Sequence, residues 1–519
     1  MAHPSLESVY PVTIKFLKEY FIDSWQHITF ELFPSFLSDL CQKAALPAFL
    51  PELAAIEAAR YQVAQQNIFV TENVATRQVN PTLEMVPVTR QGLTGFFSGQ
   101  DATLTEGTAF VLLWLHPEKK TISMREATPL DLLALKIVTE NISLQRAAAA
   151  GNTTVGALDS LLFQAASEGL ILKPPAKIRR GEDFPRGKDI DNTFFSSPVF
   201  TLQWHLTQAC DLSCRHCYDR SNRKTQGLGE AYRIFDSLFS FCQQHHVYGQ
   251  VTFTGGNPFL YSHFFEVYQR AAEMGFLTAV LGNPVTAEQL DRMAAIQRPE
   301  FYQISIEGLQ KHNDYIRGDG HFDRSLAFLA LLKQKNIYSM VMLTLTKDNM
   351  DQVLPLAAIL EDQVDLFTFN RLAAVGEGAA LRPVPCDSYP AFLASYLEAS
   401  NGSQTMGLKD NLLNILCADG KRKIFGGCAG FGCGAAFNFV SLLPDGEVHA
   451  CRKFPSPIGH ISSHSFSQIY HSEKAKKYRQ GAAECHSCRI RPVCGGCLAV
   501  SWASGQDIFI QKDPYCFIV

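Results

Sequence analysis

Three cysteines lie close together, Cys210, Cys214 and Cys217, in a C-x3-C-x2-C spacing. A four-iron, four-sulfur cluster is normally held by four cysteine thiolates, so three thiolates leave one iron with an open coordination position. An open position separates reactive metal sites from closed ones, because a small molecule can bind there. Zinc with a remote fourth ligand is the alternative for this spacing. The spacing therefore predicts a metal site and favours one that binds a ligand.

A second group of cysteines fills the C-terminal region. Its eight thiols are enough for two closed four-cysteine metal sites, although C-x2-C pairs are also typical of zinc ribbons. The chain has 15 cysteines and no recognisable export signal, which favours metal ligation over disulfides. The eight are Cys428, Cys433, Cys451, Cys485, Cys488, Cys494, Cys497 and Cys516.

The first cysteine group directly follows a predicted strand, residues 199–206, which is rich in β-branched, aromatic and leucine residues. Strand and helix patterns then alternate to about residue 372. Parallel neighbours need helical crossovers, so these six βα repeats predict an α/β fold with a parallel sheet that can curl into a partial barrel. Ligands bind at the carboxyl ends of such strands. The predicted strands are residues 199–206, 250–254, 277–281, 302–306, 339–345 and 365–370, and the predicted helices are residues 230–245, 265–274, 287–296, 323–335 and 350–360.

Segments at two other strand ends carry residues suited to ligand binding. After the second predicted strand, Gly255 and Gly256 let the backbone come close to a ligand. After the fourth, a loop carries Arg317, whose planar guanidinium suits a carboxylate. A lone arginine in such a loop is about as often a surface charge.

The cysteine loop and these strand-end segments resemble the radical S-adenosylmethionine (SAM) enzymes. The resemblance implies a partial (β/α)6 barrel and SAM chelated by the open iron. It also implies a 5′-deoxyadenosyl radical, formed when an electron from a donor such as flavodoxin or ferredoxin breaks the sulfur–C5′ bond. The family usually has glutamate where this chain has Asn257, and the contact expected there runs through the backbone. The resemblance places around SAM the residues Tyr218, Gly255, Gly256, Asn257, Pro258, Ser305, Glu307, Arg317 and Gly376.

The C-terminal cysteines resemble, in their order, the SPASM domain of radical SAM peptide-modifying enzymes, which carries two auxiliary [4Fe–4S] clusters. Three [4Fe–4S] clusters in all are therefore implied. The family often has three residues where this chain has two between Cys494 and Cys497. Carried over by order, one auxiliary cluster takes Cys428, Cys433, Cys451 and Cys497, and the other takes Cys485, Cys488, Cys494 and Cys516.

The region before the barrel predicts a hairpin, residues 108–114 with 121–124, followed by three short helices in residues 129–168. This order resembles the winged-helix-like recognition domain of peptide-modifying enzymes, where a leader peptide adds as a strand to a sheet edge. A winged-helix DNA binder has the same order. Few Lys or Arg residues lie on the would-be recognition helix, so we expect no nucleic-acid partner.

The predicted organisation has six parts. Helical periodicity with proline breaks near the N-terminus predicts a small helical module, and a segment rich in Pro, Gly and charge predicts a linker. The parts are a helical module (1–75), a precursor-peptide recognition domain (76–180), a linker (181–198), the radical SAM partial barrel (199–385), connecting helices (386–427) and the SPASM domain (428–519).

The composition is that of an ordinary globular protein, with 46% hydrophobic and 18% charged residues and a net charge of −4. This charge indicates no polyanionic partner. No stretch reaches the ~18 unbroken apolar residues of a membrane helix, and the N-terminus lacks a signal-peptide pattern. We therefore expect a cytoplasmic protein without membrane association.

A peptide-recognition region before the barrel and a SPASM domain after it together resemble maturases of ribosomally made peptides. The segment 430–455 is similar to the selenobiotic or thio(seleno)oxazole-type maturases. We therefore expect a radical SAM enzyme that modifies a precursor peptide at or near cysteine residues. The alternatives are a radical enzyme acting on another protein or a small molecule, and a non-catalytic zinc or iron–sulfur protein. Sulfatase maturases have an acidic residue directly after the third auxiliary cysteine, where this chain has Arg452.

Overall fold

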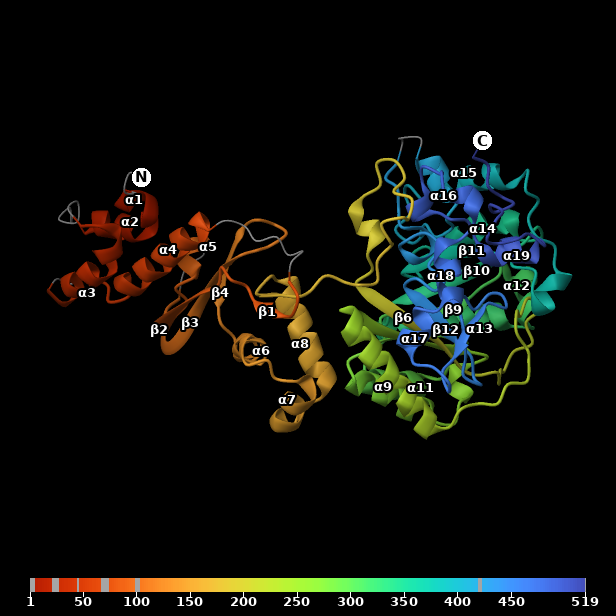
Figure 1. The fold of residues 1–519 in the computed structure, drawn as a ribbon, viewed down its shortest axis with the longest axis horizontal. Helices are drawn as coiled ribbons and strands as arrows, with labels where there is room; N and C mark the ends of the chain where they lie inside the picture. Colours follow the sequence, from red (N-terminus) through yellow and green to blue (C-terminus); the bar gives the residue numbers. More distant parts are fainter. Residues whose placement is uncertain are drawn as a thin grey trace. The chain divides into compact units, whose positions relative to one another are not determined.

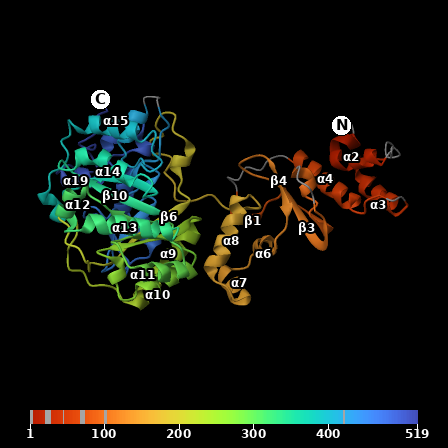
Figure 2. The ribbon, with the colours of Figure 1, turned by 180° about the vertical axis from the view of Figure 1, so that it is seen from behind.

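The computed structural model describes residues 5–20, 28–43, 46–66, 74–98, 103–418 and 422–518. The chain divides into two compact units, Met1–Pro175 and Ala176–Val519, each with hydrophobic clusters of its own (Figures 1 and 2). Within the described part of the chain, no helix is both long enough and apolar enough to cross a membrane.

The first unit begins with a helical bundle, drawn in red in Figure 1. Glu57, buried on its longest helix, accepts hydrogen bonds from the backbone N–H groups of Val12 (2.6 Å) and Thr13 (2.9 Å). The first N–H groups of a helix have no partner within the helix, so this carboxylate satisfies two of them and fixes the packing angle. The helices are α1 (Leu6–Val9), α2 (Pro11–Glu19), the 3-10 turn η1 (Phe30–Leu32), α3 (Phe33–Lys43) and α4 (Leu50–Gln65).

The rest of the first unit combines a small antiparallel sheet with three helices. The predicted hairpin and the three predicted helices are present, but a third strand, β2, pairs with β3 and was not predicted. A two-stranded pair, β1 with β5, closes the helical part. The elements are β1 (Gln78–Val79), β2 (Glu84–Gln91), α5 (Gly95–Ser98), β3 (Thr105–Leu115), β4 (Ile122–Glu126), α6 (Pro129–Thr139), α7 (Leu144–Gly151), α8 (Val155–Ser167) and β5 (Ile171–Leu172).

The second unit is built on one nine-stranded sheet with the order β11-β10-β9-β8-β7-β6-β12-β13-β14. Strands β6 to β11 are all parallel, which confirms the predicted parallel α/β sheet, and β11 does not pair with β6, so the barrel is open. The cysteine-rich region extends this sheet, because β12 pairs in parallel with β6. The strands are β6 (Val199–Thr207), β7 (Tyr248–Gly255), β8 (Leu277–Leu281), β9 (Tyr302–Ser305), β10 (Ser339–Leu345), β11 (Leu366–Arg371), β12 (Phe439–Leu442), β13 (Glu447–His449) and β14 (Pro457–His460).

Helices connect the barrel strands as expected, with one addition. The segment around Arg317, predicted as a loop, is helix α12 (Gln310–Arg317), which ends at Gly318 with a φ of 106°. The other barrel helices are α9 (Leu228–His245), η4 (Pro258–Leu260), α10 (Phe264–Glu273), α11 (Ala287–Ile296), α13 (His321–Gln334), η5 (Met350–Gln352), α14 (Val353–Leu360) and η6 (Gly376–Ala380). The later helices are α15 (Tyr389–Ala399), α16 (Leu413–Cys417), η7 (Gly427–Ala429), α17 (Phe466–Tyr470), α18 (Glu473–Gln480), η8 (Ala483–Cys485), η9 (Arg491–Val493) and α19 (Leu498–Ala503).

The segment of residues 176–198 belongs to the second unit, and it comprises the predicted linker (181–198) and the last residues of the predicted recognition domain (76–180). It contains the short helix η3 (Asn192–Phe195), and Ile178 before it is buried in the barrel core. The buried guanidinium of Arg180 donates hydrogen bonds to the carbonyl oxygens of Phe431 and Cys433, both at 3.0 Å. The segment therefore supports the first part of the cysteine-rich region.

Candidate functional site

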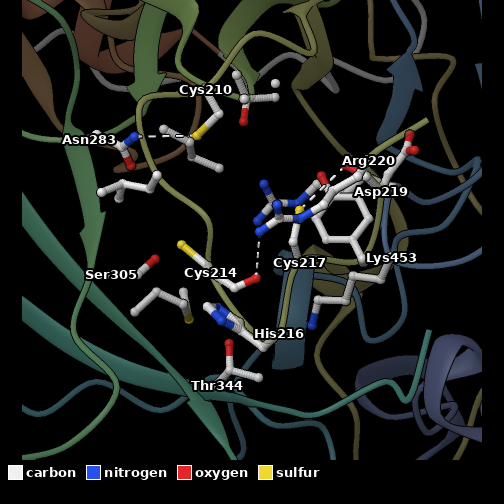
Figure 3. A pocket seen from close by; sticks show the side chains of 18 of the residues that line it. Cys210, Cys214, His216, Cys217, Asp219, Arg220, Asn283, Ser305, Thr344 and Lys453 are labelled. Atoms are coloured by element: carbon white, nitrogen blue, oxygen red, sulfur yellow. Dashed lines mark hydrogen bonds between the residues drawn. The ribbon is translucent and has the colours of Figure 1, made fainter. Parts of the chain in front are cut away.

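A pocket of about 520 Å³ opens at the carboxyl ends of the barrel strands, and Cys210, Cys214 and Cys217 all line it (Figure 3). This volume lies within the range typical of small-molecule sites. The strand ends of the barrel supply much of the wall, and the cysteine-rich region supplies two residues. Wall residues from the strands include His205, Thr254, Leu281, Gln303, Ser305, Met342, Thr344, Asn370 and Arg371.

Two glycines let the end of β7 pack against the cysteine loop. Gly255 has a φ of 130°, and a Cβ atom there would lie 2.3 Å from the carbonyl oxygen of Thr207. A Cβ atom on Gly256 would lie 2.2 Å from the carbonyl oxygen of Ala209. Any side chain would therefore force the backbone just before Cys210 to move, because non-bonded heavy atoms cannot approach so closely. Both glycines also line the pocket.

Backbone contacts fix the cysteine loop on its other sides. The N–H of Arg215 donates to the carbonyl of Ile316 (2.9 Å), and the N–H of Glu377 donates to the carbonyl of Cys217 (2.9 Å). Gly376 has a φ of 60°, and a Cβ atom there would lie 2.5 Å from the carbonyl oxygen of Tyr218. The loop is thus held by the ends of β7 and α12 and by the start of η6.

The side-chain amides of Asn257 and Asn283 and the carboxylate of Asp211 form a hydrogen-bonded cluster next to Cys210. The side chain of Asn283 donates to Asp211 Oδ1 (2.5 Å) and lies 3.6 Å from the sulfur of Cys210, as the dashed line in Figure 3 shows. Asn257 donates to the same oxygen of Asp211 at 3.1 Å. Asn257 therefore supports the loop through Asp211, and its buried side chain does not line the pocket.

Arg317 is a buried member of an ionic cluster next to Cys214, not a surface charge, with 9% of its side chain exposed. Its guanidinium donates to Glu307 Oε1 at 2.7 and 3.0 Å, and its Nη1 lies 3.7 Å from the sulfur of Cys214. His216 Nε2 lies 3.1 Å from the same Glu307 oxygen. Burial alone would raise the pKa of Glu307, but its contacts with His216 and with the guanidinium of Arg317 lower this pKa well below its ordinary value. Glu307 is thus a permanent anion that orients Arg317.

The residues predicted around the cofactor fall into two sets. Five line the pocket directly, and four do not. The five are Tyr218, Gly255, Gly256, Ser305 and Arg317, and the four are Asn257, Pro258, Glu307 and Gly376.

The eight C-terminal cysteines are brought together in two groups. The pKa of Cys433 is raised to about 11. Burial is the main cause, and the neighbouring thiols of Cys497 and Cys428 act in the same direction. Burial likewise raises the pKa of Cys451 to about 12, and Cys497 and Cys433 act in the same direction. These four cysteines are therefore electrostatic neighbours.

The second group has the same character. Burial raises the pKa of Cys485 to about 11, with Cys488 and Cys516 as neighbours that act in the same direction. Cys494 also has Cys488 and Cys516 as neighbours. The two groups interleave, because the N–H of Cys433 donates to the carbonyl of Cys494 at 2.8 Å. Within the described residues, no three His, Cys, Asp or Glu side chains converge on one point as they would around a single metal ion.

A buried ion network joins the barrel to both groups. Arg371, at the end of β11, donates to both carboxylate oxygens of Asp513 (2.8 and 2.7 Å) and to Asp410 (2.8 Å). Asp513 accepts the backbone N–H of Cys497 on its carboxylate and that of Cys516 on its carbonyl. Removing one partner of such a buried network leaves an uncompensated charge, which costs about 3–5 kcal/mol. The network therefore fixes one cysteine of each group relative to the pocket.

Several of these residues carry no motif in the sequence. Asn283 stands in a Gly-Asn-Pro sequence after β8, which is a turn signal at a strand end. Arg371 and Asp513 are separated by more than a hundred residues, and only the fold brings them together. Arg452 and Lys453 line the pocket from the loop after Cys451. Their positions directly after a cysteine do not predict that they line the pocket.

The donor set fits iron–sulfur clusters. The cysteines are all free, three of them line one ligand-sized pocket, and eight more form two groups of four. Four thiolates complete a closed cluster, and three leave one iron open to a ligand.

Comparisons with known proteins agree with this geometry. Residues 204–360 match the radical SAM superfamily, and residues 433–497 match the SPASM iron–sulfur cluster-binding domain. The chain is 29% identical over 355 residues to the mycofactocin maturase MftC of Mycolicibacterium smegmatis, covering 64% of this chain and 85% of that protein. It is 24% identical over 347 residues to the AdoMet-dependent heme synthase of Methanosarcina barkeri, covering 61% and 95%.

Solved structures also align with the chain. Streptococcus suis SuiB bound to precursor peptide SuiA aligns with a TM-score of 0.49 at 14% identity, covering 79% of this chain and 96% of that one. The first matched range contains the three-cysteine loop and strands β7 to β10, and the second contains strands β12 to β14. The two family matches therefore show that the chain carries a radical SAM domain followed by a C-terminal SPASM domain.

Proposed function

We propose that this enzyme uses SAM and one electron to modify a ribosomally made precursor peptide. The observation that carries the proposal is the composition of the pocket wall, where the three-cysteine loop faces residues of the cysteine-rich domain. The similarity to MftC, which is named a mycofactocin maturase, supports a peptide substrate. The similarity to an AdoMet-dependent heme synthase favours a small-molecule substrate as the second candidate.

In the proposed site, Cys210, Cys214 and Cys217 hold a four-iron cluster with one open iron. When bound there, the cluster supplies the electron that cleaves SAM and yields a carbon radical able to remove hydrogen from the substrate. The chain's own residues position SAM and exclude water. Gly255 and Gly256 expose backbone at the cavity, and Arg317 presents a guanidinium whose direction Glu307 fixes.

The SPASM domain, in this proposal, holds two further clusters. One takes Cys428, Cys433, Cys451 and Cys497, and the other takes Cys485, Cys488, Cys494 and Cys516, which are the two neighbour groups described above. The enzyme then carries three [4Fe–4S] clusters, or about twelve irons per chain. A one-electron carrier such as a flavodoxin or ferredoxin is the expected electron donor.

The first unit offers edges for a leader peptide. The three-stranded sheet has the order β2-β3-β4, so β2 and β4 are its edge strands. An extended peptide can add to such an edge through backbone hydrogen bonds. We therefore assign leader binding to residues 76–175.

A truncation separates the two candidate substrates. The test compares the full chain with residues 176–519, using as substrate a short cysteine-containing peptide encoded beside this gene. Because leader binding is assigned to the first unit, we expect the truncated protein to cleave SAM but to lose peptide modification by about 100-fold or more, as judged by mass spectrometry. Unchanged modification by the truncated protein would contradict leader binding by the first unit. SAM cleavage by the full chain without any modification of the peptide would favour the second candidate.

A further inference from the structure

The pocket is rich in positive charge, and most of that charge already has a partner. Arg317 is paired with Glu307, and Arg371 is paired with Asp410 and Asp513. Arg220 donates to the carbonyl of Cys214 at the rim. The five cations of the wall are Arg220, Arg317, Arg371, Arg452 and Lys453.

Arg452 and Lys453 differ from the other three. In the part of the chain that the structure describes, neither side chain forms a hydrogen bond or an ion pair. Both are half-buried, and Figure 3 shows the Lys453 side chain extending into the pocket. Asp219, an acidic residue of the same wall, is held by Gln208 (2.8 Å) and Arg223 (3.7 Å) and so does not neutralise them.

The positive charge of Arg452 affects His205, another residue of the pocket wall. Burial lowers the pKa of His205 to about 3, and Arg452 is the largest charged contribution in the same direction. His205 is therefore neutral, and it adds no positive charge of its own. A half-buried cation that forms no hydrogen bond or ion pair keeps its charge available, and a ligand with a negative charge interacts more strongly with it in the pocket than in water.

An alternative role for Arg452 and Lys453 would be to neutralise the negative charge of the first group of C-terminal cysteines. Lys409 is placed for that role, because its neighbours include the thiol of Cys428. Lys453 lies within electrostatic reach of Cys451 and Cys497, and its side chain also lines the pocket, into which Figure 3 shows it extending. Lys453 thus stands between the auxiliary group and the cavity.

We propose that Lys453, assisted by Arg452, binds a carboxylate of the peptide substrate, supplied either by an Asp or Glu side chain or by the C-terminus. This proposal rests on the proposed function and specifies its substrate class. A charge-assisted hydrogen bond to the ammonium would hold the neighbouring substrate residue in the cavity, between the three-cysteine loop and the auxiliary group. Lys453 would therefore be a specificity-determining residue.

The test uses a random octapeptide library and the anaerobic, iron-loaded full chain with excess SAM. Bound peptides are identified by mass spectrometry. One arm uses peptides with an amidated C-terminus, and the other uses peptides with a free C-terminus. The enzymes are the natural chain, Lys453→Met, Lys453→Arg, Lys453→Glu and Arg452→Gln, with Lys474→Met as the matched control because Lys474 is exposed on α18.

We expect the natural chain, Lys453→Arg and Lys474→Met to enrich Asp and Glu over Asn and Gln by about tenfold. Lys453→Met should lose this preference, Lys453→Glu should reverse it towards Lys and Arg, and Arg452→Gln should weaken it. Enrichment in the amidated arm assigns the carboxylate to a side chain. A preference for free-acid peptides without internal enrichment assigns it to the C-terminus. Every variant has the same first unit, so any peptide binding by that unit contributes equally to the enrichment measured for each variant.

Two results would overturn the proposal. One is an absence of any acidic or free-acid preference in the natural chain, or its persistence in Lys453→Met. The other is a loss of SAM binding by Lys453→Met in equilibrium dialysis, which would assign the ammonium to SAM. Failure of the proposed function is a separate outcome, because it appears as an absence of 5′-deoxyadenosine from the natural chain with reductant.

Discussion

Replacement of Cys214 by alanine should abolish the formation of 5′-deoxyadenosine. Two thiolates would remain in the loop, and the guanidinium of Arg317, 3.7 Å from the Cys214 sulfur, would lose the anion beside it. A four-iron cluster needs its cysteine ligands, so the iron content should fall by about four per chain. The measurement is 5′-deoxyadenosine by liquid chromatography, with anaerobic enzyme, SAM and dithionite, together with iron analysis.

A matched cysteine variant controls this experiment. Cys386 is exposed and belongs to neither the loop nor the two C-terminal groups, so Cys386→Ala should keep both its iron and its SAM cleavage. Nucleoside formation by Cys214→Ala at a rate near that of the natural chain would mean that the cluster sits elsewhere.

Replacement of Cys488 by alanine should also remove one cluster, but it should leave SAM cleavage intact. Cys488 is a neighbour of Cys485 and Cys494 in the second C-terminal group and does not line the pocket. We therefore expect a loss of about four irons per chain, retained cleavage of SAM without peptide, and at least a 100-fold loss of modified peptide. Electron paramagnetic resonance of the reduced protein should still show the cluster that binds SAM.

Comparing SAM cleavage by Cys214→Ala with SAM cleavage by Cys488→Ala distinguishes the roles of the two cysteine groups. If Cys488→Ala also abolished SAM cleavage while it kept the iron of the three-cysteine loop, the division between a SAM-cleaving site and an auxiliary site would fail. If the peptide were modified normally, the second group would have no role in turnover.

The barrel strands could be predicted because each is a buried apolar run bounded by turn residues, as in residues 339–345. Strand β2 was missed because Pro87 lies within it, and proline argues against a strand. The structure resolves this conflict, since β2 is an edge strand. Strands β12 to β14 are only three or four residues long, too short for an alternating pattern to identify them.

The candidate site was predictable where its chemistry depends on local spacing. Cys210, Cys214 and Cys217 are close in sequence, and a loop of eight residues keeps them close in space. The support of Arg317 by Glu307 was not predictable, because it depends on helix α12 turning the guanidinium inward. Lys453 was missed for a similar reason, since the pairing of β12 with β6 is what carries the SPASM loop to the barrel mouth.

Metal analysis of the anaerobically purified full chain, combined with a nucleoside assay, tests the central claim most directly. The account predicts about twelve irons per chain, a brown protein, and 5′-deoxyadenosine when SAM and dithionite are added. Zinc in place of iron, or fully iron-loaded protein that never cleaves SAM, would contradict it.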